Sequence, residues 1–438
     1  MRVAIVAGEY PTSRAPERAM FVRDQVDALR AAGHDVTVVH HEPPTLRRAV
    51  TDVRRRRAVT DVRRRRAERR AAASTSTPVA GRRASVTVSS ASTTAPSPAP
   101  AVVAPGTAPS PSGSAGKGAS ARLRTAGRVL HDRAGQAAAA AAMRRDLRRL
   151  DPAPEVVHAH NVFPAGAAAV RFGRERDVPV VVTEHSSAFR RDQLAPSEIA
   201  RARRIYEACA AVVAVSPSQA AALPAEDVVV VGNVVPAGFG LRRPEAARSG
   251  DLVSIGTLRA HKGMDALVRA YAILPAHVRD RHHLVLVGDG PEAPRLAALV
   301  AELGLTGRVR LTGHVARDRV ATILRGAALV VSASPVETFG VTLLEGLSAG
   351  VPFVAVRSGG PESVWFPGAG VLVPTGSPEN LALGLEAALT PGTDECTTTP
   401  DEDRRRVAQD RFGGPAVAAR LSALYRAATA APGDRTGR

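Results

Sequence analysis

Short apolar runs alternate with stretches of helical spacing from the start of the chain. Arg2–Ala7 reads as a buried strand, and Gly8–Pro16 reads as a loop rich in turn-forming residues. Phe21–Ala32 carries apolar residues three and four positions apart, Gly33 closes it, and Val36–Val39 is the next apolar run. A strand, a helix and a second strand in this order predict the beginning of a doubly wound α/β sheet.

The same alternation resumes near residue 126 and continues almost to the end of the chain. The expected strands are Val156–His158, Val178–Thr183, Ala211–Val215 and Val228–Val231, then Leu252–Ile255, Leu284–Val287, Val309–Thr312, Leu329–Ser332 and Phe353–Val356. With Pro236–Pro244 as linker, the predicted domains are 1–240 and 241–414. The last segment, 415–438, contains a helix over Pro415–Ala428 that is expected to cross back onto the first domain.

The segment between these two stretches has a different composition. The nine residues Ala49–Arg57 are repeated letter for letter at Ala58–Arg66, and residues 72–120 are mostly Ala, Ser, Thr, Pro and Gly. Such a composition buries too little apolar surface to offset the entropy of ordering. Residues 45–125 are therefore predicted to be a disordered basic insert in the first domain.

The net charge of +18 has one source. Residues 45–150 hold 23 Lys and Arg against 5 Asp and Glu, a difference equal to the net charge of the whole 438-residue chain. The remaining residues are neutral, so nucleic acid is not an expected partner of the folded body. The arginine blocks are read first as a solvated extension. Contact with an anionic membrane surface is the leading alternative, ahead of nucleic acid.

The N-terminal apolar run is too short for a signal peptide, and no stretch reaches the roughly 20 apolar residues that span a bilayer. Two cysteines, Cys209 and Cys396, are too few for a disulfide framework. Together these features favour a cytoplasmic protein, with residence at the inner face of the membrane left open.

Lysine is almost absent from this chain. Of 59 basic residues only Lys117, inside the insert, and Lys262 are lysine. Lys262 follows the expected strand Leu252–Ile255, in a loop that begins at Gly256, and precedes a helix. A compact ammonium at the carboxyl end of a parallel strand suits a diphosphate.

A second loop, from Ser332 to a helix beginning near Gly340, carries two carboxylates. Glu337 lies before the helix, where it can accept hydrogen bonds from sugar hydroxyls, and Glu345 lies inside it, where it can accept from a ribose diol. The first amide groups of a helix have no internal acceptor and attract anions.

These loops, with other motifs in the same order, resemble glycosyltransferase family 4, which has the GT-B fold of two Rossmann-like domains and a retaining mechanism. The motifs are Val157–His160, Thr183–Ser186, Gly256–Gly263, Val287–Pro291, Leu311–Val315, Glu337–Glu345, Gly346–Pro352 and Gly359–Glu362. The resemblance covers residues 1–44 and about 150–430. It implies a hexosyltransferase-type enzyme that uses a UDP- or GDP-linked sugar as substrate and needs no cofactor.

The resemblance also implies roles for particular residues. Lys262 holds the donor diphosphate, Glu337 contacts the donor sugar, and His185 lies near both, so these three are the expected catalytic residues. Phe339, Gly340 and Val341 present backbone amides to the donor, and Glu345 binds its ribose. His158 and His160 are expected to be structural, on the reasoning that alternate positions cannot both face the ligand.

Two positions depart from the family pattern. Thr257 stands where an arginine is common, so Arg259 or an arginine of the first domain is expected to supply the second positive charge. Gly8 is the candidate for the glycine that usually lies beside the diphosphate, since the later position where related chains carry glycine is Ala19. Asp401-Glu402-Asp403 is read as solvated surface charge, and no metal site is predicted.

Three alternatives stay open at this point. The first is a GT-B epimerase or phosphorylase, which shares the sheets but forms a different product. The second is a non-catalytic sugar-nucleotide-binding protein, and the third is a nucleic-acid-binding protein that acts through the arginine blocks. The acceptor is left as a glycan, a lipid or a small molecule.

Overall fold

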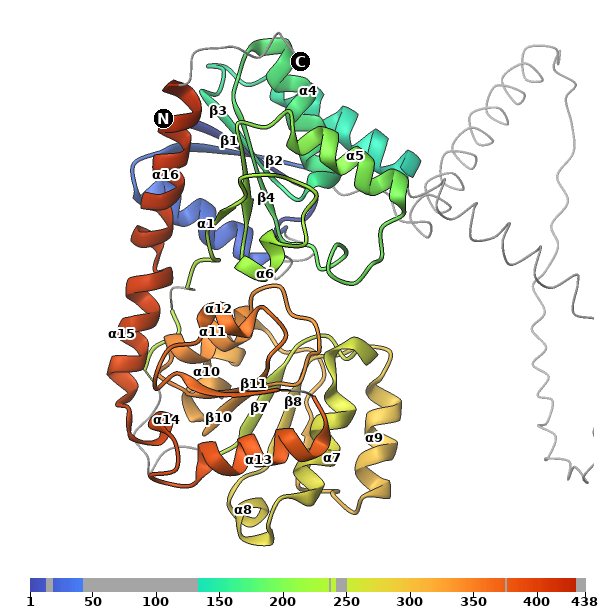
Figure 1. Cartoon of the computed structure of the whole chain (residues 1–438), viewed down its shortest axis with the longest axis vertical. Coiled ribbons are helices and arrows are strands. Elements are labelled where there is room, and N and C mark those ends of the chain that lie inside the picture. Colours follow the sequence, from blue (N-terminus) through green and yellow to red (C-terminus); the bar gives the residue numbers. More distant parts are fainter. Residues whose placement is uncertain (13–18, 42–132, 236–237, 242–249, 375, 431–438) are drawn as a thin grey trace, which may run out of the picture. The chain divides into compact units, whose positions relative to one another are not determined.

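The computed structural model of the chain describes residues 1–12, 19–41, 133–235, 238–241, 250–374 and 376–430. The whole of the expected insert, 45–125, and part of the expected linker lie outside these residues. Two six-stranded parallel sheets with flanking helices form the described part (Figure 1), which confirms the predicted α/β class. The proposed domain boundaries stay a prediction.

The first sheet has the strand order β2-β1-β3-β4-β5-β6. Its strands are β1 (Arg2–Ala7), β2 (Asp35–His40), β3 (Val156–His160), β4 (Val180–Glu184), β5 (Ala211–Ala214) and β6 (Val229–Val230). Its helices are α1 (Met20–Ala31), a helix over residues 133–147, the π-helical turn η1 (Val162–Gly166), α4 (Ala167–Arg176), α5 (Pro196–Tyr206) and α6 (Pro217–Ala220).

The second sheet has the order β12-β11-β10-β7-β8-β9. Its strands are β7 (Leu252–Ile255), β8 (Leu284–Val287), β9 (Val309–Leu311), β10 (Leu329–Ser332), β11 (Phe353–Val356) and β12 (Gly370–Val373). The helices that follow them are η3 (Ala260–Lys262), α7 (Met264–Ile273), α8 (Ala276–Arg281), α9 (Ala293–Glu302), α10 (Arg317–Gly326), α11 (Val341–Ser348), α12 (Pro361–Val364), α13 (Pro378–Leu389), α14 (Glu395–Thr398), α15 (Asp401–Phe412) and α16 (Gly414–Ala430).

Each sheet is covered on both faces, as an all-parallel sheet requires. In β8, Leu284 and Leu286 belong to one core cluster, while Val285 and Val287 belong to the other, so the strand supplies both layers in alternation. In both sheets the strand order reverses at an inner pair, β1 with β3 and β7 with β10. Ligands of open α/β sheets bind at the carboxyl ends of such pairs.

The last helix of the described chain completes the core of the first sheet. Val417, Leu421 and Tyr425 of α16 are buried in the cluster formed by β1 and α1, and His34 bonds Ser422 at 2.7 Å. The preceding helix, α15, packs against α11 of the second sheet. The C-terminal helix α16 therefore packs on the first sheet.

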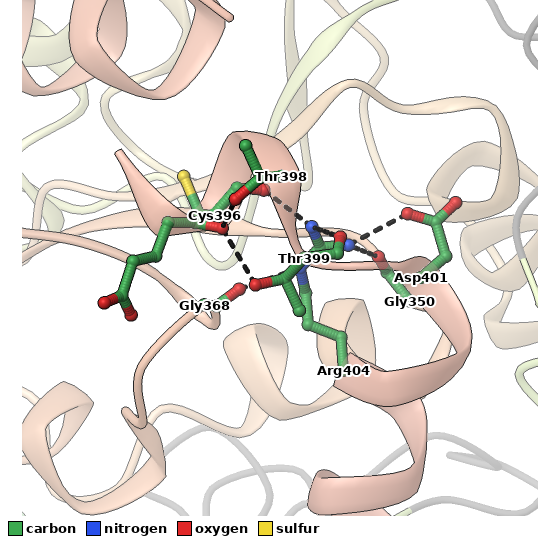
Figure 2. A network of polar contacts seen from close by, with 8 residues as sticks. Gly350, Gly368, Cys396, Thr398, Thr399, Asp401 and Arg404 are labelled. Carbon is green, nitrogen blue, oxygen red and sulfur yellow. Dashed lines mark hydrogen bonds and ion pairs between the residues drawn. The ribbon is translucent and has the colours of Figure 1, made fainter. Parts of the chain in front are cut away.

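Arg404 is the largest fully buried side chain of the described residues, and it organises the turn before α15 (Figure 2). Its guanidinium donates to the carbonyl oxygens of Gly368 (2.9 Å), Gly350 (2.7 Å), Cys396 (2.6 Å) and Thr399 (2.6 Å). It also bonds a carboxylate oxygen of Asp401 at 2.9 Å. One side chain thus bonds four carbonyl groups from three segments.

Candidate active site

Lys262 lies where the loop after β7 approaches the end of β10. It ends the short helix η3, and Gly263 follows in a left-handed conformation with φ of 66°. A Cβ atom at Gly263 would lie 2.3 Å from the carbonyl oxygen of Ala333, so only glycine permits this approach. The close contact brings the lysine to the loop that carries Glu337.

Lys262 and Glu337 form an ion pair in this structure. The ammonium Nζ lies 2.8 Å from Oε2 of Glu337, and the two side chains keep 26% and 20% of their exposure. The other carboxylate oxygen accepts the amide of Thr338 at 3.1 Å. Gly340 then adopts φ of 95° and leads into α11, whose first amide groups have no intrahelical acceptors. A cation and a helix start thus occur side by side.

Two cavities meet at the end of β7. One, of about 260 Å³, is lined by Lys262, Glu337 and Val341, and the other, of about 380 Å³, is lined by Arg317 and Glu345. Ile255, Gly256 and Thr257 line both, so the cavities share a wall at the carboxyl end of the strand. Gly256 itself has a positive φ of 157°, and a Cβ there would meet open space.

Glu345 lines the second cavity, and its pKa differs strongly from that of a free carboxyl group. Burial raises its pKa to about 7, Arg317 opposes this and Asp24 adds to it. Arg317 of α10 lies 3.8 Å from Glu345 and bonds both oxygens of Asp24 in α1, at 3.2 and 2.7 Å. The sequence reasoning missed Arg317, because nothing nearby in the sequence marks it as a partner of a residue in another helix.

His185 ends a row of three imidazoles, His158, His160 and His185, which we call the histidine stack. The ring centroids lie 4.7 Å apart for the first pair and 5.1 Å apart for the second, and Nδ1 of His160 lies 2.9 Å from Nε2 of His185. His158 and His160, expected to be structural, are buried and line neither of the two cavities. Their rings nevertheless share one face of the strand, because residues two apart in a strand point to the same side.

Burial keeps the histidine stack neutral. It lowers the pKa of His160 to about 3 and, with the neighbouring imidazoles, holds the pKa values of His158 and His185 well below the usual range. His185 therefore offers a neutral hydrogen-bonding ring. It does not offer a cation for a phosphate. The phenyl ring of Phe21 lies against it, with centroids 4.5 Å apart.

Glu184, which belongs to the Thr183–Ser186 motif but was assigned no role from the sequence, fixes the loop that carries His185. Its buried carboxylate accepts the amides of Val162 (2.9 Å), His185 (3.1 Å) and Ser186 (2.8 Å) and the hydroxyl of Tyr206 (3.0 Å). Burial raises its pKa, and these four donors oppose the rise. Tyr206, expected only to pack, thus also holds this carboxylate.

The remaining predicted site residues, Gly8, Arg259, Phe339 and Gly340, do not line the two cavities. Arg259 is exposed beside η3, and Gly8 is buried after β1 against Pro164. The ring of Phe339 packs edge-on against Phe412, which leaves only its backbone for a ligand.

A first-domain arginine does come close to the Glu337 loop: Arg190 donates to the carbonyl oxygens of Glu337 and Ser358. In the part of the chain that the structure describes, no cluster of His, Cys, Asp and Glu could hold a metal ion.

Two family models match the chain in succession. The model for glycosyltransferase family 4 matches residues 99–238, and the model for group 1 glycosyl transferases matches residues 243–406. The chain belongs to glycosyltransferase family 4. Its two doubly wound sheets accordingly form the GT-B fold that the sequence motifs implied. Within the described residues no helix has the length and apolar character to span a membrane.

Several curated proteins are similar to this family 4 chain. The D-inositol 3-phosphate glycosyltransferase of Corynebacterium efficiens is 31% identical over 191 residues, 41% of this chain and 43% of that protein. The enzyme of the same name from Jonesia denitrificans is 29% identical over 317 residues, 65% of this chain and 74% of that protein. The first relatives are matched over about two fifths of their own length.

Solved structures share the fold at low identity. Sucrose-phosphate synthase from Thermosynechococcus elongatus superposes with a TM-score of 0.63 at 17% identity and covers 97% of this chain and 98% of its own. Anabaena HepE, solved with UDP and glucose, gives a TM-score of 0.54 at 20% identity, with 62% and 78% covered.

Proposed function

We propose that this chain transfers a glycosyl group, with retention of anomeric configuration, from a nucleoside-diphosphate sugar to a hydroxyl of a glycan, lipid or small-molecule acceptor. The observation that carries the proposal is the convergence of Lys262, Glu337 and the start of α11 on one cavity at the end of β7. A neighbouring cavity with a carboxylate and an arginine adjoins it. The pair matches a donor made of a sugar diphosphate and a nucleoside.

In this proposal the departing diphosphate is stabilised by charges that are already in place. Lys262 supplies a full positive charge, and the free amides at the start of α11 supply partial ones. Such groups act where negative charge develops in the transition state, and they provide this stabilisation without a metal ion. Arg190, held against the Glu337 loop, is the first-domain arginine that would add the second positive charge.

The carboxylates and the neutral histidine would bind the uncharged parts of the donor. Glu337 accepts hydrogen bonds from sugar hydroxyls, and Glu345 accepts from the ribose diol. His185, neutral and placed by Glu184, hydrogen-bonds the sugar from the first domain. With no nucleophile assigned to attack the sugar, the acceptor hydroxyl would enter on the face from which the diphosphate leaves. UDP or GDP is the proposed carrier, and the UDP bound to Anabaena HepE supports the former.

The test begins with calorimetry of the full chain against UDP-, GDP- and ADP-linked sugars, followed by turnover of the sugar that binds. Removing one preorganised group that stabilises developing negative charge lowers the rate roughly 10²- to 10³-fold. Lys262→Ala should therefore lower the turnover rate by at least that factor. Lys117→Ala, the other lysine, should leave turnover unchanged. Equal turnover of wild type and Lys262→Ala would refute the assignment.

The ion pair requires a further control. Lys262→Ala leaves Glu337 without its cation, so a loss of activity could reflect a displaced loop. Lys262→Met combined with Glu337→Gln removes both charges and restores a balanced pair. The proposal expects normal thermal stability and no turnover from that double variant. Product analysis separates transfer from epimerisation or phosphorolysis, and tight nucleotide binding without any product would indicate a non-catalytic protein.

A further inference from the structure

A third cavity, which we call the hollow, lies among the helices of the first sheet. The helix over residues 133–147, α4 and α5 enclose a cavity of about 320 Å³. Its floor is apolar, with Ala140, Ala167, Val170 and Ile205 among the lining residues. None of the residues that line the two cavities beside β7 lines this one.

The rim of this hollow is made of arginines from all three helices. They are Arg144, Arg171, Arg174, Arg201 and Arg204. Arg144 bonds Glu175 at 3.0 Å, and Arg201 bonds Gln136 at 3.1 Å and lies over the ring of Phe163. Within the described residues Arg171, Arg174 and Arg204 are exposed and have no acidic partner.

This arrangement is costly without a counter-ion. Arg171 and Arg174 lie three positions apart on α4, as do Arg201 and Arg204 on α5, and like charges at this spacing repel each other. Among the residues that the structure describes, no carboxylate lines the cavity. A planar guanidinium is also the cation best suited to phosphate oxygens.

We propose that this hollow binds a phosphate monoester with an apolar body. Arg171, Arg174 and Arg204 hold the phosphate at the rim, and the hydrocarbon lies on the alanine and valine floor. A membrane lipid and a soluble ester both present this chemistry. The proposal is independent of glycosyl transfer, so neither fails with the other.

Helix ends alone do not account for the rim. Arg174 and Arg204 lie in the last turns of α4 and α5, where a cation complements the helix dipole. The same turns also carry Arg176 and Arg203, which are exposed and do not line the hollow. Arg176 and Arg203 therefore provide a control for Arg174 and Arg204, with the same charge and the same helix turns but outside this hollow.

The experiment titrates octyl phosphate, below its micelle concentration, into the full chain by calorimetry. Arg174→Gln with Arg204→Gln should weaken binding about 100-fold, roughly tenfold for each charged hydrogen-bonding partner. Arg176→Gln with Arg203→Gln should stay within about twofold of wild type, since the same net charge is removed outside the hollow. Equal weakening by the two double variants would overturn the proposal.

The apolar floor is tested separately by Ala141→Phe, a substitution at an exposed residue that lines the hollow. The added ring should abolish octyl phosphate binding while leaving the thermal unfolding temperature unchanged. Inorganic phosphate and octanol, titrated as probes of each half alone, should both bind far more weakly than octyl phosphate. If inorganic phosphate binds as tightly as the ester, the apolar body plays no part and the proposal fails.

Vesicles then distinguish the two sources of ligand. Phosphatidylcholine vesicles with and without phosphatidic acid are sedimented with both double variants, so that attraction by the arginine blocks of the insert is common to each. Loss of sedimentation in the Arg174 and Arg204 variant alone identifies a lipid. Equal sedimentation, together with the calorimetric difference, identifies a soluble ester.

Discussion

Replacing Arg404 of α15 by methionine should be among the most destabilising single changes in the part of the chain built on the second sheet. The side chain is 2% exposed and donates five hydrogen bonds, four of them to backbone carbonyl oxygens. Methionine has a similar length but no donor, so the substitution leaves those carbonyls without partners. The change therefore isolates the hydrogen bonds more than the volume.

The loss of unfolding free energy expected for Arg404→Met can be bounded from two sides. Five bonds to a charged group at about 1.5–3 kcal/mol each would exceed the whole stability of many domains, about 5–15 kcal/mol. That sum is too large, because the unfolded state regains the hydration of the guanidinium and water can enter the altered site. Breaking a buried charged pair by removing one partner costs about 3–5 kcal/mol, and about 4 kcal/mol is our expectation.

The measurement is calorimetric unfolding of the full chain with a control from the same helix. Arg406 is also paired with an aspartate three residues earlier, but it is 64% exposed. Arg406→Met should change stability by less than about 0.5 kcal/mol. Arg404→Met should lower the unfolding temperature by about 8 °C or more, at roughly 2 °C per kcal/mol.

Arg404→Lys gives an intermediate test, because an ammonium has three donors and cannot span all the carbonyl groups. We expect about half of the loss seen with methionine. The reasoning is refuted if Arg404→Met and Arg406→Met unfold within 1 °C of each other.

Three further predictions concern the first domain and the nucleoside cavity. Ala19 has φ of 49° at the N-cap of α1, so Ala19→Gly should be neutral or stabilising by up to about 1 kcal/mol in urea unfolding, whereas Ala28→Gly inside α1 should cost about 1 kcal/mol. Because burial lowers the histidine pKa values in the folded state, the unfolded chain binds protons first as pH falls below 6.5. Stability should then drop by about 1.4 kcal/mol per pH unit for each histidine of the stack, down to about pH 3 for His160. In His160→Asn the free energy of unfolding should decrease less steeply as pH falls below 6.5. An unchanged steepness would contradict the account. With the pKa of Glu345 raised to about 7, affinity for a nucleotide sugar should increase between pH 6 and 8 and become flat in Glu345→Gln, as measured by calorimetry.

The strands were predicted best where both faces are buried. Leu252–Ile255, Leu284–Val287 and Phe353–Val356 were placed with their correct ends, because a continuous apolar run bounded by turn residues has few other readings. The strand at Val178 begins two residues late, at Val180, since Pro179 has no amide to pair. Gly370–Val373 was missed, because a short run that begins with glycine resembles a loop.

The candidate site was predictable where one loop supplies the chemistry. Lys262 and Glu337 stood out by residue type and position after a strand, and the structure brings them within 2.8 Å of each other. Arg317 and Arg190 were not predictable, because their partners lie far away in the sequence. In a chain with so many arginines, no single arginine stands out by its residue type. The stacking of His158 on His160 could have been predicted, since a period of two places both residues on one face of the strand.

The position of α16 has a consequence for the order in which this protein can mature on the ribosome. Val3, Ile5 and Val26 need Val417, Leu421 and Tyr425 to cover them, yet the whole second sheet is translated between the two groups. One side of the earliest strands therefore stays exposed to solvent or chaperones until the last helix emerges. A nascent chain stopped before residue 414 should be more easily cleaved by protease in its first half than in its second.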